Sequence, residues 1–191
     1  MKQTELRNKP NGVKEMSTDH GSVQLSPGRR SHLRQVTFVR HQMTVPSTRK
    51  FRIATWNVRT LYQIGKLENV EREMNRLRVD MLGLSEVRWP GEGCNQMDNG
   101  GTFVLAGGET AERGVAIMLT ESVGKCIIGY WAVSDRVLLV RIKGNPFNIF
   151  LIQVYAPTTQ HEEDEMDKLY REVQSAKDQC KQHEMIVVMG V

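Results

Sequence analysis

The chain has 191 residues, is 39% hydrophobic and carries a net charge of +4, which suits one globular domain with a flanking tail. No run approaches the roughly 20 apolar residues that cross a bilayer, and the polar first residues are not a signal peptide. Three widely spaced cysteines predict free thiols rather than a disulfide framework, so we expect an intracellular protein of the nucleus or cytoplasm with no membrane partner.

Residues 1–50 are polar and basic, with ten Lys or Arg against three Asp or Glu. This segment holds too few apolar residues to offset the entropy of ordering, so we predict a disordered basic leader. A basic leader can contact nucleic acid weakly and without sequence preference, although most such segments are simply solvated. The sequence texture changes at Phe51, and residues 51–191 are predicted to form the domain.

The first predicted elements of the domain form a βαβ unit. Alternating side chains predict a strand over 51–58, and apolar residues at helical spacing predict a helix over 65–77. A buried strand follows and ends at Glu86. The two strands of such a unit run parallel, so Asn57 and Glu86, at their carboxyl ends, are expected to face one crevice.

The rest of the chain predicts mostly strands. Residues 90–101 are a predicted loop, and 185–189 a last buried strand. Thr159 and Glu162 have capping-box spacing and predict the start of a second helix. Its predicted apolar stripe consists of Met166, Leu169, Tyr170, Val173 and Ala176. Further strands are expected at 102–106 and 114–120, as a hairpin, and at 125–131, 136–143 and 147–155.

Five short motifs share their order and spacing with a known family. They are Ala54-Thr-Trp-Asn57-Val, Leu84-Ser-Glu86-Val-Arg-Trp89, Arg113-Gly-Val-Ala-Ile117, Ser134-Asp-Arg136 and Gln153-Val-Tyr155-Ala-Pro-Thr158. Together they resemble the endonuclease/exonuclease/phosphatase superfamily, and most closely the apurinic-type endonuclease domain of RTE/Bov-B-like non-LTR retrotransposons. The resemblance covers residues 51–190, about three quarters of the chain.

This resemblance implies a Mg²⁺-dependent phosphodiester hydrolase that acts on DNA, with the DNase I-like α+β fold. By likeness, Glu86 would ligate the metal. Asn57 would orient the metal or a phosphate oxygen, and Tyr155 would stabilise charge at the scissile phosphate. Weaker substrate-binding candidates are Arg136, Arg88 and Trp89, of which Arg136 is also expected to brace the central strands.

The sequence departs from the family pattern at its end, where Val191 stands in place of an Asp. The family's Asp-x-Asn, later Asp and Asp-His pair do not follow. We therefore expect the first part of a four-layer α/β/β/α sandwich, with a mixed, mainly antiparallel sheet, two helices and the second sheet missing. This truncated copy would fold poorly alone and lack useful nuclease activity. The alternatives are a nucleic-acid-binding remnant without catalysis, or an active endonuclease if the true chain continues past Val191.

Overall fold

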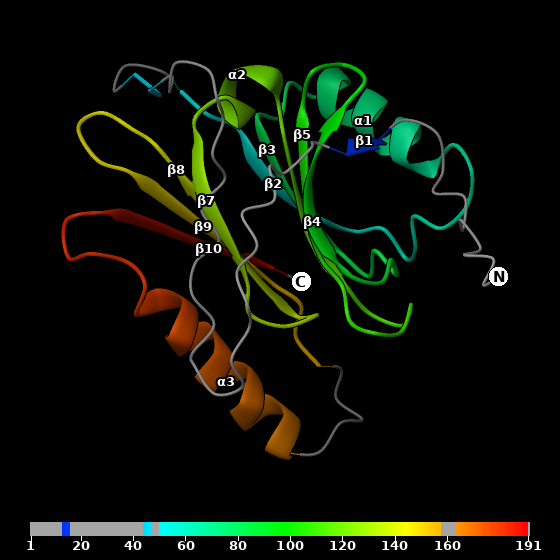
Figure 1. Ribbon diagram of the computed structural model, residues 1–191, viewed down its shortest axis with the longest axis vertical. Helices are drawn as coiled ribbons and strands as arrows, with labels where there is room; N and C mark the ends of the chain where they lie inside the picture. The colour runs from blue at the N-terminus through cyan, green and yellow to red at the C-terminus, as the bar shows by residue number, and fades with distance from the viewer. Residues whose placement is uncertain (1–12, 16–43, 47–49, 158–162, 191) are drawn as a thin grey trace, which may run out of the picture.

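The computed structural model describes residues 13–15, 44–46, 50–157 and 163–190. Two β-sheets pack face to face, with a helix on the outer face of each, so all four layers of an α/β/β/α sandwich are present (Figure 1). None of the helices in these ranges is long and apolar enough to span a bilayer.

The first sheet has six strands and is mainly antiparallel. Its strand order is β1 (Val13–Glu15), β4 (Glu92–Met97), β5 (Thr102–Ala106), β6 (Val115–Leu119), β3 (Met81–Ser85) and β2 (Ile53–Asn57). Only β2 and β3 run parallel among these described pairs, as the βαβ unit requires. Their connection is α1 (Lys66–Arg76), which begins after Gly65, a glycine with the left-handed φ of 82°.

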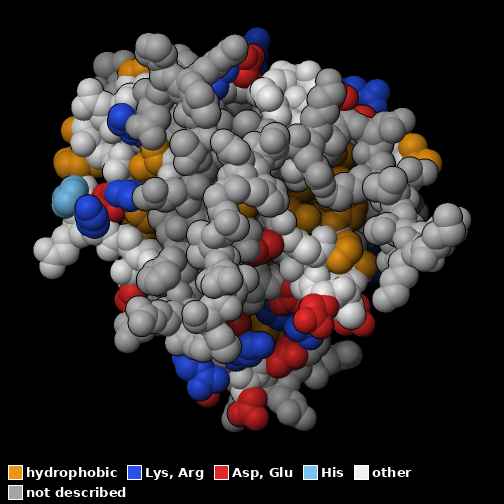
Figure 2. All heavy atoms as spheres, viewed as in Figure 1, with side chains coloured by type: hydrophobic (Ala, Val, Ile, Leu, Met, Phe, Trp, Pro, Cys, Tyr) orange, Lys and Arg blue, Asp and Glu red, His pale blue; other side chains and the backbone are white. Residues whose placement is uncertain are grey.

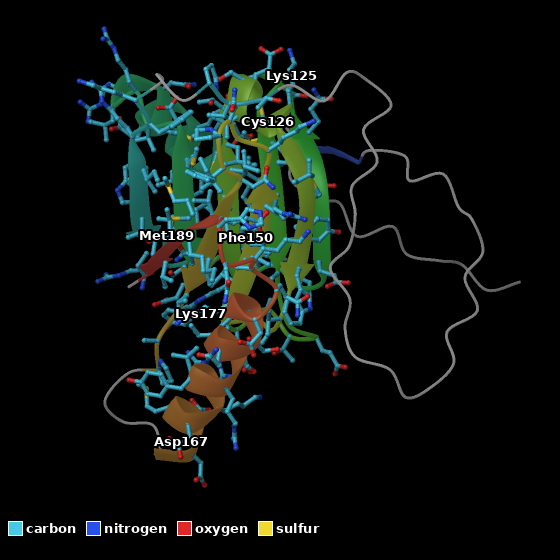
Figure 3. The ribbon with its side chains drawn as sticks, turned by 90° about the vertical axis from the view of Figure 1, so that its left-hand side faces the viewer. Lys125, Cys126, Phe150, Asp167, Lys177 and Met189 are labelled. Atoms are coloured by element: carbon cyan, nitrogen blue, oxygen red, sulfur yellow. The ribbon has the colours of Figure 1, made fainter. Side chains whose placement is uncertain are left out.

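The second sheet has four strands in the order β10 (Met185–Gly190), β9 (Ile149–Val154), β8 (Val137–Ile142) and β7 (Ile127–Ala132). The helix α3 (Glu163–Lys177) follows β9, and its chain returns as β10, which pairs parallel to β9. Figure 3 shows Met189 on β10 and Phe150 on β9, with Lys177 at the end of α3. A short helix, α2 (Glu121–Gly124), leads from the first sheet to the second.

Three hydrophobic clusters hold the layers together. The cluster between the two sheets includes Met81, Ile117, Leu138, Val140 and Leu151. A second cluster lies between the first sheet and α1, and a third lies between the second sheet and α3. Strands that are apolar on both faces therefore sit between a helix and the opposite sheet, because each face must be covered.

Several expectations need correction. The second sheet, expected to be missing, is present and is formed by strands within 127–154 and 185–190. The prediction was wrong because an apolar strand pattern does not show to which sheet a strand belongs. A strand, β4, lies inside the predicted loop 90–101 and pairs with β5. Tyr170 is 64% exposed, so it lies outside the buried stripe of α3. The helices number three, including the short α2, in the part of the chain that is described.

The predicted boundary at residue 51 stays a prediction, because most of the leader lies outside the described residues. Two pieces of that leader contact the domain. The strand β1 pairs with β4, and Val45, 5% exposed, packs in the core between the sheets. The capping pair of Thr159 and Glu162 also lies outside the described residues.

Candidate functional site

The structure brings three of the predicted site residues together where strands of both sheets end. Asn57 is the last residue of β2, Glu86 follows β3, and Tyr155 follows β9. Asn57 stands opposite Ser85 in the parallel register of β2 and β3, which places it beside Glu86. Asn57 and Glu86 therefore meet at the ends of the parallel strands β2 and β3, and the second sheet adds Tyr155.

Glu86 lies at the centre of the cluster. The Asn57 amide donates a hydrogen bond of 2.6 Å to Glu86 Oε1, and the Tyr155 hydroxyl donates one of 3.2 Å to the same oxygen. The Arg88 guanidinium donates to Glu86 Oε2 at 3.1 Å. Asn57 is held in turn, because its Oδ1 accepts the Arg59 backbone N–H at 3.0 Å. These contacts fix the orientation of the carboxylate.

The backbone around Glu86 adopts an uncommon conformation. Glu86 has a φ of 56° and Arg88 a φ of 57°, both in the left-handed region that non-glycine residues seldom enter. Val87, between them, is fully buried. Its N–H donates to the Gly114 carbonyl at 3.0 Å, and the Arg88 N–H donates to the Arg113 carbonyl at 2.7 Å. The buried valine and these two bonds hold the turn that aims Glu86 away from the strand.

The hydrogen bonds also set the charge state of the cluster. The Asn57 amide, followed by the Arg88 and Tyr155 donors, lowers the pKa of Glu86 against the opposing effect of burial. Burial and the neighbouring Glu86 carboxylate raise the pKa of Tyr155. At neutral pH the cluster therefore consists of a carboxylate and a protonated phenol that donates to it.

The weaker candidates are placed differently from one another. Arg88 lies at the rim, and its side chain is 46% exposed. Trp89 packs against Phe103 with ring centroids 5.5 Å apart, and its indole N–H is buried without a hydrogen-bond partner among the described residues. Arg136 is 7% exposed. Substrate binding by these three stays a prediction, although only Arg88 combines exposure with contact to Glu86.

The bracing role expected of Arg136 agrees with its contacts. Its guanidinium donates to the Tyr155 carbonyl at 3.3 Å and to Glu165 Oε2 at 3.1 Å. The same group lies over the Tyr155 ring, 5.2 Å from the centroid. The Tyr155 N–H donates to the Arg136 carbonyl at 2.9 Å. Arg136 thus connects the start of β8 and α3 to the residue that reaches Glu86.

The sequence interpretation gave no role to a second polar group beneath the site. Gln153, Ser85 and Thr55 lie between the two sheets, and Gln153 and Ser85 are fully buried. The signal that marks this group is a polar glutamine within the apolar strand Ile149–Val154. Its position opposite Ser85 cannot be read from either strand alone.

A cavity of about 490 Å³ is lined by residues from 90–92, 107–109 and 132–135, and by none of Asn57, Glu86 and Tyr155. Its lining contains three acids, Glu92, Glu109 and Asp135. Negative side chains disfavour a phosphate backbone, so this hollow does not extend the Glu86 cluster as a phosphate-binding surface.

The donors present fit a hard divalent cation in part. Mg²⁺ binds oxygen ligands, often one or two carboxylates, and keeps several water molecules and substrate phosphates. Glu86 offers one charged carboxylate at the rim. No three His, Cys, Asp or Glu side chains gather elsewhere in the described ranges as a ready metal site. Glu86 would therefore be the one charged protein ligand, and water and phosphate oxygens would have to supply the other ligands.

Comparisons with known proteins show which sequences and folds are similar to this chain. No family model matches the chain. Craniofacial development protein 2 of Bos taurus is 36% identical over 138 residues, which cover 72% of this chain and 23% of that protein. The chain thus spans about a quarter of the length of the curated relatives that it matches.

Two solved structures share its fold. An AP endonuclease from Archaeoglobus fulgidus superposes with a TM-score of 0.51 at 19% identity, over 74% of this chain and 56% of that one. The AP endonuclease LMAP from Leishmania major gives 0.53 at 14% identity, over 73% and 54%. At such identities the likeness establishes the fold, which is DNase I-like, as the motifs predicted.

Proposed function

We propose that the chain is an endonuclease-type domain of the endonuclease/exonuclease/phosphatase superfamily, whose Glu86 cluster binds a divalent cation and a nucleic-acid phosphate; its sequence motifs, its fold and its similarity to craniofacial development protein 2 support this assignment. We propose further that this 191-residue chain does not hydrolyse the phosphodiester at a useful rate. Its five ordered motifs support descent from a retrotransposon endonuclease. DNA is the proposed partner, and Mg²⁺ the proposed cation.

The observation that carries the binding proposal is the charged Glu86 held between an amide and a phenol. Asn57 and Tyr155 both donate to Glu86 Oε1, at 2.6 and 3.2 Å. A bound Mg²⁺ would act as a Lewis acid on a phosphoryl oxygen. Glu86 would supply the anionic ligand, while Asn57 orients it. The Tyr155 hydroxyl has a single proton, so it would give up its contact with Glu86 Oε1 to donate to a phosphate oxygen once a cation held the carboxylate.

The same charge states argue against rapid hydrolysis. A general base works best when its pKa lies near the operating pH, and it contributes about 10²- to 10⁴-fold to the rate. The pKa of Glu86 is lowered, which makes it a weak base, and the pKa of Tyr155 is raised, which keeps its proton in place. Neither side chain of the cluster is suited to take a proton from an attacking water molecule near pH 7.

A plasmid-nicking assay combined with a Mg²⁺ titration tests both parts. The variants are Glu86→Gln, which removes the anionic ligand, and the control Glu68→Gln on the exposed face of α1. We expect Mg²⁺ binding by the wild type and by the control, but not by Glu86→Gln, together with no nicking by any of them. Nicking that Glu86→Gln abolishes would overturn the claim of slow hydrolysis. Equal Mg²⁺ binding by all three would overturn the site.

Nucleic-acid binding without a cation is the second candidate. Arg88 and Arg59 flank the cluster, and both are exposed. Each phosphate neutralised by a cationic side chain contributes about 0.7 to 0.9 to the slope of log affinity against log salt. In a filter-binding titration without Mg²⁺, Arg88→Gln should lower that slope by about 1. A slope near zero in the wild type would dismiss this candidate.

A further inference from the structure

A polar trio lies between the two sheets, directly beneath the Glu86 cluster. It consists of Gln153 on β9, Ser85 on β3 and Thr55 on β2. The Gln153 side-chain amide donates to Ser85 Oγ at 3.0 Å and to Thr55 Oγ1 at 3.4 Å. Gln153 and Ser85 have no exposed surface. The trio is therefore a polar link across an interface that is packed mainly with apolar side chains.

This link is not the most stable way to fill the space. Gln153 Oε1 is buried and has no hydrogen-bond partner among the described residues. A buried acceptor without a donor carries a free-energy cost, whereas an apolar side chain of similar shape avoids it. The first sheet makes room for the amide, because a Cβ at Gly83 would lie 1.8 Å from Gln153 Oε1. Stability alone does not account for a glutamine here.

Strand geometry connects the trio to the site. Residues two apart on a strand project to the same face, roughly 7 Å apart. Gln153 and Tyr155 therefore both reach from the second sheet toward the first, where Gln153 meets Ser85 and Tyr155 meets Glu86. Thr55 precedes Asn57 by two residues, and Ser85 directly precedes Glu86. Each member of the trio thus stands one or two residues before a member of the site.

We propose that Gln153 is a positioning residue: its amide ties β9 to β2 and β3, and so fixes the distance from the Tyr155 hydroxyl to the Glu86 carboxylate. The two site residues belong to different sheets, so the slide of one sheet over the other sets their separation. Aliphatic packing resists separation of the sheets but has little directional preference. The hydrogen bonds of Gln153 supply that direction. The importance of this distance rests on the proposed function, but the distance itself is a property of the fold.

The experiment reads the Tyr155–Glu86 contact without any metal. The full chain is labelled with ¹³C at the tyrosine Cζ, and the Tyr155 resonance is assigned among four tyrosines with Tyr155→Phe. Glu86→Ala defines the position of that resonance without its acceptor. We expect Gln153→Met, which keeps the volume but removes the amide, to shift the Tyr155 resonance most of the way toward the Glu86→Ala position. The thermal midpoint should change by only a few degrees.

The matched control is Asn148→Ala. Asn148 precedes β9 and donates to Glu184 Oε1 at 2.8 Å, so its loss weakens the same strand away from the site. We expect a lower thermal midpoint and an unmoved Tyr155 resonance. If Gln153→Met also leaves the resonance in place, Gln153 only stabilises the fold and the proposal is overturned.

Ser85→Ala keeps the proposal falsifiable if Gln153→Met does not fold. It removes the acceptor of the 3.0 Å bond with the loss of one oxygen atom. We expect the Tyr155 resonance to move in the same direction by a smaller amount, and an unmoved resonance would overturn the proposal. A separate Mg²⁺ titration of the wild type tests the proposed function. Absent Mg²⁺ binding with a shifted resonance would refute the function and leave the positioning role standing.

Discussion

At the scale of single residues, the charge of Glu86 makes folding stability depend on pH. The Asn57 amide and then Arg88 and Tyr155 hold the pKa of Glu86 below that of an unfolded glutamate, about 4.3. A lowered pKa contributes stability above pH 4.3, and this contribution is lost as the pH falls through the folded value. Between pH 5 and 3, the wild type should therefore lose more stability than Glu86→Gln.

Urea unfolding at a series of pH values measures this difference. The midpoints of wild type and Glu86→Gln should converge as the pH falls, because the protonated Glu86 of the wild type then resembles the glutamine in charge. Glu68→Gln, on the exposed face of α1, serves as the control and should follow the wild type. Parallel curves for the wild type and Glu86→Gln would show that the Glu86 contacts do not stabilise its charged form.

The residues of the site differ in how far sequence alone predicts them. Asn57 and Glu86 follow from a physical rule, because parallel strands end at one edge of a sheet. Tyr155 follows only from the family resemblance, because its contact with Glu86 joins two sheets whose relative placement no single strand pattern encodes. Gln153 likewise acts through a contact between the two sheets. Its strand alone shows only one polar residue in an apolar run, and the sequence does not predict what that residue contacts.

At the scale of elements, α3 is attached to the second sheet by charged side chains as well as apolar ones. Glu165 accepts from Arg136 at 3.1 Å and from Arg113 at 3.3 Å, and Glu172 accepts from the Ser134 hydroxyl at 2.7 Å. Figure 2 shows side chains of both signs gathered at the lower end of this face. Leu169 and Ala176 supply the buried stripe. The helix is thereby fixed to the strand that carries Arg136.

Glu165→Gln tests the charged part of this attachment. The Arg136 side chain is 8% exposed and would lose its anionic partner, but Glu165 is 34% exposed, so solvent already screens the pair. We expect the free energy of unfolding to fall by about 1 kcal/mol, measured by urea denaturation. Asp167→Asn, an exposed position on the same helix, should change it by less than about 0.5 kcal/mol. Equal effects would assign the loss to the helix itself rather than to the ion pairs of Glu165 with Arg136 and Arg113.

The last strand is predicted correctly, but its burial is not. Residues 185–189 form β10, but its burial pattern alternates between exposed and half-buried. Val187 and Met189 pack against the core between the sheets, while Ile186 and Val188, on the opposite face of the strand, are 39% and 52% exposed. An apolar run predicts two covered faces. Among the described elements, α3 packs against β8 and β9, and the side chains on the outer face of β10 stay exposed.

At the scale of the whole molecule, the sequence predicts the layers of the fold better than it predicts the composition of each sheet. The four layers follow from strands and helices that each need a partner for an apolar face. The sequence does not predict how the ten strands of the described ranges divide between the two sheets, because a strand that is apolar on both faces has the same pattern in either sheet. Poor folding was expected for want of a second sheet. Since that sheet is present, the loss of a whole apolar face does not arise, and the β10 edge is one place where apolar side chains are exposed among the described residues.

That edge predicts self-association of the 191-residue chain. Met185 is 54% exposed, Ile186 39% and Val188 52%, and β10 lies at the edge of its sheet. An exposed apolar edge strand is a template for pairing with another chain, and a lysine on such a strand opposes it. We expect the sedimentation coefficient of the wild type to rise with concentration, and that of Val188→Lys to stay at the monomer value.

The comparison that isolates the strand edge is Ile64→Lys. Ile64 is 94% exposed in the loop before α1, so this substitution adds the same charge and removes a comparable apolar side chain away from any sheet edge. If association depends on the edge, Ile64→Lys sediments like the wild type while Val188→Lys does not. If both lysines abolish the concentration dependence, the cause is the overall charge and apolar surface. If neither substitution changes the concentration dependence, association proceeds through another surface and the β10 edge is not the site of pairing.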